Sequence, residues 1–79
     1  MPTIITILTI RGMHAVHAVR AVETALGGIA GVSAAEVSLG EARVRHAPEL
    51  APAVLVEAID VAGFEVEGWR QERRHLPTV

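Results

Sequence analysis

Two hydrophobic periods alternate along this chain, and their order constrains the fold more than any other feature. Residues 3–11 are rich in β-branched side chains and predict a strand that ends at Gly12. From Ala15 to Leu26, apolar side chains recur every three or four residues, which predicts a helix that stops at the glycine pair 27–28. The predicted apolar stripe of this helix consists of Val16, Val19, Val22 and Leu26.

The second half of the chain repeats the alternation. Strands are predicted over Val32–Leu39 and Ala42–His46, and the turn between them is so short that they must form an antiparallel hairpin. A second helix is predicted over Ala51–Ala62, with Gly63 as its C-terminal cap. The predicted apolar stripe of the second helix consists of Val54, Leu55, Ala58, Ile59 and Ala62.

Residues 64–69 add a fourth strand, so the predicted order is βαββαβ. Right-handed crossovers then place both helices on one face of a four-stranded antiparallel sheet. The fold class is α+β, a ferredoxin-like sandwich, and this fold alone does not define a function. We expect residues 1–70 to form the domain and residues 71–79 a flexible C-terminal tail.

Composition excludes several classes of function. The net charge is −2 and only 3% of the residues are aromatic, so the chain offers neither a basic surface nor base-stacking side chains, and an RNA-binding variant of the fold is the weakest option. No serine–histidine–acid grouping and no phosphate-binding loop is evident, so we expect no enzyme. The apolar run 4–10 is too short to span a bilayer and lacks the flanks of a secretion signal. We therefore expect a cytoplasmic protein without membrane insertion.

The loop before the first helix carries a family pattern. It reads GMHAVHA from Gly12 to Ala18, and later segments read GV at 31–32, EARV at 41–44 and EAIDVAGFE at 57–65. With these segments in this order, the chain resembles the heavy-metal-associated domain of small copper chaperones and of the N-terminal modules of P-type ATPases. The resemblance implies heavy-metal, above all copper, binding and trafficking. It also implies a protein partner, such as a metal-transporting P-type ATPase or another carrier domain.

The chain departs from that family at the two metal ligands. The family motif is G-M-x-C-x-x-C, and alanine occupies both cysteine positions, Ala15 and Ala18. A methyl group has no lone pair, so we expect no cofactor and no tight Cu(I) binding in this form, although the fold would keep both positions at the mouth of the loop. A cysteine-containing parent would carry copper or, alternatively, zinc or another soft metal. The alanines are either substitutions in a working GMHCVHCV motif or the natural residues of a cysteine-free relative.

Two imidazoles remain in the loop, His14 and His17. Their spacing of three residues at a helix start allows both to point to one side, as weak donors for Zn²⁺, Ni²⁺ or Cu²⁺. The alternative is that both are solvent-exposed loop residues without a ligand role. His46 and His75 are predicted at the far end of a strand pair and in the tail, so neither is placed to complete a site.

Other residues are candidates for supporting the loop. Gly12 breaks the strand, and Met13 is in phase with the buried face of the strand, so it should turn inward as a packing anchor. By resemblance, Phe64 lies beside the metal loop and shields it from water; an ordinary core phenylalanine would occupy nearly the same place. Arg11 and Arg20 flank the loop and could guide docking to an acidic partner.

A second class of function stays open from the sequence. The chain could be a metal-independent protein-interaction or regulatory module that keeps this fold and has lost the ion. Native cysteine at codons 15 and 18 of the natural gene would support the carrier, and native alanine would support the module.

Overall fold

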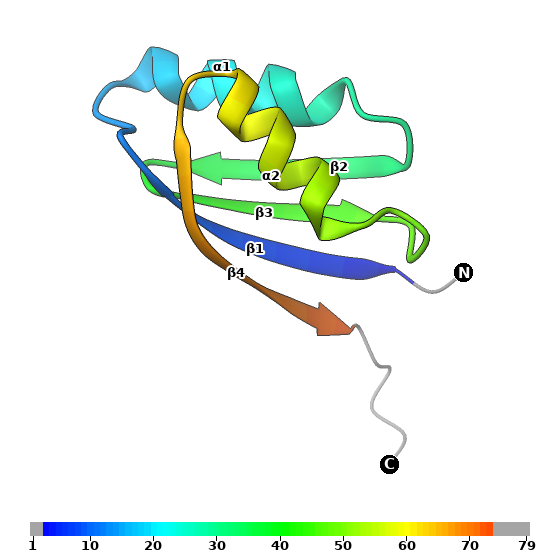
Figure 1. Cartoon of the computed structure of the whole chain (residues 1–79). Helices are drawn as coiled ribbons and strands as arrows, with labels where there is room; N and C mark the ends of the chain where they lie inside the picture. Colours follow the sequence, from blue (N-terminus) through cyan, green and yellow to red (C-terminus); the bar gives the residue numbers. More distant parts are fainter. Residues whose placement is uncertain (1–2, 74–79) are drawn as a thin grey trace.

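The computed structural model describes residues 3–73 and confirms the predicted βαββαβ order. The elements are β1 (Ile4–Arg11), α1 (Val16–Gly27), β2 (Val32–Ser38), β3 (Glu41–His46), α2 (Pro52–Val61) and β4 (Glu65–Arg73). All three strand pairings are antiparallel, and both helices cover the same face of the sheet (Figure 1). Neither helix in the described part of the chain has the length and apolarity needed to cross a membrane.

β1 lies inside the sheet, whose order is β2-β3-β1-β4. Its sequence explains this position, because apolar side chains occupy both of its faces. Leu8 and Ile10 belong to the core beneath the helices, whereas Ile5 and Ile7 alternate with them and are buried on the opposite face. In this order β2 and β4 are the two edge strands.

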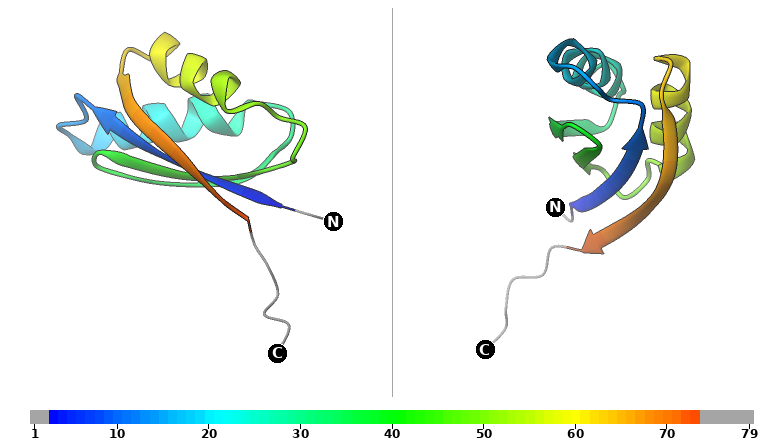
Figure 2. Two further views of the ribbon diagram at one scale, coloured as in Figure 1. Left: turned by 60° about the horizontal axis from the view of Figure 1, so that its bottom comes forward. Right: turned by 90° about the vertical axis from the view of Figure 1, so that its left-hand side faces the viewer.

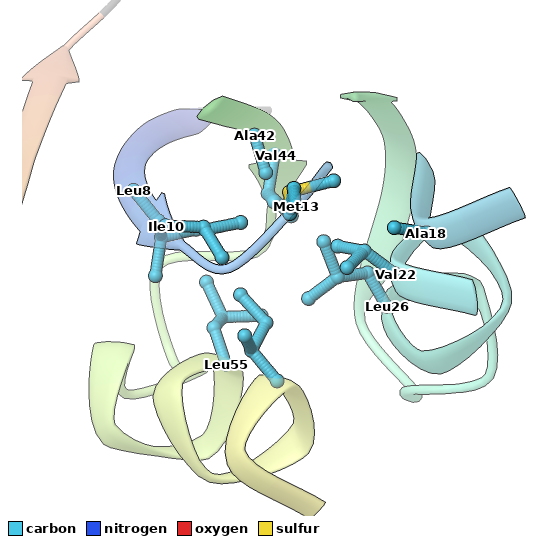
Figure 3. Close-up of a cluster of buried hydrophobic side chains, with 10 residues drawn as sticks. Leu8, Ile10, Met13, Ala18, Val22, Leu26, Ala42, Val44 and Leu55 are labelled. Atoms are coloured by element: carbon cyan, nitrogen blue, oxygen red, sulfur yellow. The ribbon is translucent and has the colours of Figure 1, made fainter. Parts of the chain in front are cut away.

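The core between the sheet and the helices is made of fully buried aliphatic side chains. Val22 and Leu26 come from α1 and Leu55 and Ile59 from α2, and they meet Leu8, Ala42 and Val44 of the sheet (Figure 3). β3 alternates, with Ala42 and Val44 buried and Arg43 and Arg45 exposed.

For two residues, the prediction that they belong to the apolar stripe of their helix is wrong. Val16 is 74% exposed, and Ala18 takes its place in the buried row of α1. At 100° per residue, Val16 lies about 120° from Val22 around the helix axis, whereas Ala18 lies only about 40° from it. Val54 of α2 is 42% exposed for a similar reason, since Leu55 and Ile59 define the buried face.

β4 continues to Arg73, three residues beyond the predicted end of the domain at residue 70. The register pairs Ile5 with Glu72 and Thr6 with Gln71, so the first residues assigned to the tail are part of the sheet. The prediction missed them because an edge strand with polar side chains carries no apolar alternation. The rest of the predicted tail, including His75, lies outside the described residues.

Candidate metal site

The loop between β1 and α1 is shaped by one glycine and anchored by one methionine. Gly12 has φ of +94°, a left-handed conformation that residues with a Cβ atom rarely adopt. The chain thereby turns sharply, and the Met13 side chain, 6% exposed, packs into the core (Figure 3). Its neighbours in this cluster include Leu8 and Ile10.

Phe64 lies beside this loop. A Cβ atom placed on Gly12 would lie 3.9 Å from Phe64 Cδ1, so the phenylalanine ring closes one side of the turn. Phe64 is half-buried and also packs against the core cluster, so the same ring contacts both the loop and the core. That Phe64 shields the loop from water stays a prediction. It is held there by the turn after α2, in which Gly63 has φ of +98°.

The two motif positions, Ala15 and Ala18, stand at the start of α1. Ala15 is the N-cap residue, with φ of −145° and ψ of 161°, and its carbonyl accepts a hydrogen bond of 2.9 Å from the Ala18 amide. The structure separates them by burial: Ala15 is half-buried, but Ala18 is only 5% exposed and belongs to the core cluster. The expectation that Ala18 sits at the mouth of the loop is therefore wrong, because its side chain in the first turn of α1 is buried in the core cluster. The same expectation for Ala15 stays a prediction.

The electrostatics of this helix start favour an anion. The Ala15 side chain makes no capping hydrogen bond, and the first turn of α1 contains no acidic residue. Its free N–H groups and the helix dipole therefore present partial positive charge without a local counter-charge. A thiolate at either position would be stabilised by this field, and a methyl group gains nothing from it.

The remaining donors of the loop do not form a closed site. His14 and His17 are both exposed. Among the described residues, no group of three or more histidine, cysteine, aspartate or glutamate side chains gathers to hold a metal ion. His46 ends β3 opposite Ile4, at the other end of β1, about 26 Å from Gly12 at ~3.3 Å per strand residue. The residues present therefore do not fit soft, two-thiolate coordination of Cu(I).

Arg11, at the base of the loop, is held by carboxylates of β4. Its Nε and Nη2 donate hydrogen bonds of 2.9 and 2.6 Å to Glu67 Oε2, and Nη1 lies 3.8 Å from Glu65 Oε1. The hydrogen bond to Glu67, and then the charges of Glu67 and Glu65, raise the pKa of Arg11. Of the two arginines that flank the loop, Arg11 is thus paired with carboxylates, whereas Arg20 is exposed.

Sequence reasoning missed a buried polar network at the opposite end of the sheet. Thr6 and His46 are 0% and 1% exposed, and Thr6 Oγ1 lies 2.6 Å from His46 Nε2. Gln71 Nε2 donates to Thr6 Oγ1 at 3.2 Å, and His46 Nδ1 lies 2.9 Å from the Ala47 carbonyl oxygen. The available signal was phase, because Thr6 lies on the same face of its strand as Leu8 and Ile10, and His46 on the same face as Ala42 and Val44.

Comparison with known proteins agrees with this geometry. The family model described as the heavy-metal-associated domain matches residues 7–65. A CopZ metallochaperone is 35% identical over 78% of this chain and 97% of its own, with a TM-score of 0.75. A copper binding domain from HMA7, a P-type ATPase, is 29% identical, with 95% of this chain and 96% of that chain covered and a TM-score of 0.72.

A further similar structure is the putative copper-ion-binding protein from Bacillus anthracis str. Ames. It is 26% identical over 77% of this chain and 90% of its own, with a TM-score of 0.73. The comparison with curated proteins gives no match. Because the family model spans more than half of the residues, the chain belongs to the heavy-metal-associated domain family.

Proposed function

We propose that this chain is a non-catalytic, cytoplasmic domain of heavy-metal trafficking, of the copper-carrier type, in a form that does not bind Cu(I) tightly. The proposal depends on one observation: the residues that shape the loop are present, but Ala15 and Ala18 offer no donor atom for a metal ion. Gly12 turns the chain, Met13 anchors it and Phe64 closes its side. The similarity to a copper metallochaperone and to a copper binding domain of a P-type ATPase supports this function.

The partner is a protein that hands over or receives the ion. We propose a metal-transporting P-type ATPase or another carrier domain, because the similar structures include both kinds of protein. Transfer between such domains requires thiolates that can be exchanged one at a time, and a thiolate at position 15 would be the accessible one. Position 18 is 5% exposed, so a sulfur there would be shielded from solvent and from the partner.

The imidazoles of His14 and His17 offer at most a weak site for Zn²⁺, Ni²⁺ or Cu²⁺. Imidazole suits these ions, but structural zinc sites use four protein ligands and catalytic sites three. Both side chains are exposed, so any ion held by this pair would complete its coordination with water.

Restoring both thiols is the test. The variant Ala15→Cys with Ala18→Cys should take up one equivalent of Cu(I) in competition with a chromophoric Cu(I) chelator, whereas the chain with both alanines should leave the ion on the chelator. The helix start already favours thiolates, which is why two single-atom additions suffice. The extra sulfur at the buried position 18 should cost about 1 kcal/mol of stability, and circular dichroism checks that the fold is kept.

A matched control separates the loop from the mere presence of two thiols. Arg20→Cys with Glu23→Cys places two cysteines at the same spacing on exposed positions of α1, away from its N-terminus. This control should bind Cu(I) far more weakly than the loop variant. Tight stoichiometric Cu(I) binding by the chain with both alanines, or equal binding by the two cysteine variants, contradicts the proposal.

A further inference from the structure

α2 and the edge strand β4 lie on the flank of the molecule away from α1 (Figure 2, right). Residues of both elements line a surface groove. The groove is shallow and open to solvent, with a volume of about 460 Å³. Its apolar floor includes Val56 of α2 together with Val66 and Trp69 of β4. Trp69 is the sole tryptophan of the chain and is 49% exposed, so a large aromatic surface is left uncovered in this groove.

The rim of the groove is acidic. Glu57 and Asp60 come from one side of α2, and Glu65 begins β4. Among the described residues, neither Glu57 nor Asp60 takes part in an ion pair, and Glu65 is approached only by Arg11 at 3.8 Å. Within residues 3–73 no arginine or histidine lines the groove, so the charge of this lining is negative and attracts cationic side chains.

The groove also adjoins an open sheet edge. β4 is the last strand on its side of the sheet, and its nine residues make it the longest strand of the domain. An extended peptide can pair with such an edge through its backbone while alternate side chains enter an adjacent pocket. Charged side chains on β4 also disfavour nonspecific pairing of this edge with other strands. We therefore expect binding here to require a peptide of opposite charge.

We propose that the groove between α2 and β4 docks an extended, cationic segment of a protein partner. Aliphatic side chains of the segment would cover Val56 and Val66. Its lysine or arginine side chains would meet Glu57 and Asp60, and one cation would lie over the Trp69 indole, a favourable cation–π arrangement. The residues involved differ from those of the metal loop, so this surface operates whether or not the loop carries an ion.

The probe for this proposal is a synthetic peptide, Lys-Lys-Val-Val-Lys-Lys-Val with blocked ends, titrated into the full chain. In the extended conformation each face of this peptide carries both lysine and valine. Because Trp69 is the sole tryptophan, its emission reports the groove directly and should shift to shorter wavelength as the indole is covered. Amide chemical shifts should change along α2 and β4 and not in residues 12–18. A peptide with glutamate in place of lysine should produce neither change.

Matched charge variants assign the effect to the rim. Glu57→Gln with Asp60→Asn should weaken binding of the lysine peptide about tenfold, since two exposed ion pairs are lost at up to ~0.7 kcal/mol each. Glu23→Gln with Glu49→Gln removes the same charge from exposed positions outside the groove, and affinity should change less than about twofold. The proposal is overturned by an unchanged Trp69 emission, by equal weakening in the two variants, or by amide shifts centred on the metal loop or on β2.

Discussion

Replacing Thr6 with valine should destabilise the domain by about 2 kcal/mol, although the two side chains have nearly the same shape. The reason is a chain of hydrogen bonds that crosses three strands. The Ala47 carbonyl can only accept, so His46 Nδ1 must carry a proton and donate to it at 2.9 Å. In the neutral imidazole, Nε2 then accepts from the Thr6 hydroxyl at 2.6 Å, and the Thr6 oxygen accepts from Gln71 Nε2 at 3.2 Å.

The magnitude follows from burial. Thr6 and His46 are 0% and 1% exposed, and no buried side-chain nitrogen or oxygen among the described residues lacks a partner. Valine removes the one donor that the described residues supply to His46 Nε2, and a buried acceptor left unpaired costs about 1–3 kcal/mol. The Gln71 side chain is exposed and can turn to water, so it adds little. For a domain of this size, a loss of ~2 kcal/mol lowers Tm by about 12 °C.

The assay is chemical and thermal unfolding followed by circular dichroism. Thr9→Val is the matched control, because Thr9 lies on the same strand with its side chain exposed; its free energy of unfolding should change by less than about 0.5 kcal/mol. A double variant, Thr6→Val with His46→Leu, removes both partners and should lose less than the sum of the single losses. If Thr6→Val proves as mild as Thr9→Val, the hydrogen-bonded network contributes nothing measurable and the reasoning is refuted.

Two further predictions concern α1. Ala15→Ser supplies the capping oxygen that the helix lacks and should raise the free energy of unfolding by about 1 kcal/mol, measured by denaturant titration; no gain would mean that the first N–H groups are already satisfied. Val22→Ala should cost about 2 kcal/mol because Val22 is fully buried, whereas Val16→Ala, at a position 74% exposed, should stay within ~0.5 kcal/mol of the parent. Equal losses in these two variants would support the stripe expected from the sequence over the one in the structure.

Much of the fold was readable from local pattern. The β-branched run that becomes β1, the glycines at 12 and 63 and the short turn at Gly40 each predict a local conformation that the structure contains. These signals are strong because they depend on backbone sterics and on side-chain alternation, which neighbouring residues alone determine.

The identity of the loop was also a property of the sequence. GMHAVHA at the end of a strand indicated the family, and the loss of both thiolates follows from Ala15 and Ala18 whatever the fold does with them. The structure then shows which features of the loop between β1 and α1 are present: the start of α1, the inward Met13 and the neighbouring Phe64.

Tertiary structure alone decided which residues on each element face the core and which distant residues meet. Ala18 is buried and Val16 exposed because the packed sheet and α2 select one rotational setting of α1, and periodicity by itself left that setting open. The network of Thr6, His46 and Gln71 joins three strands whose pairing register no local signal specifies. The physical reason is the same in both cases: short-range sterics fix the conformation of a segment, but burial and hydrogen-bond partners are set by contacts between segments far apart in the chain.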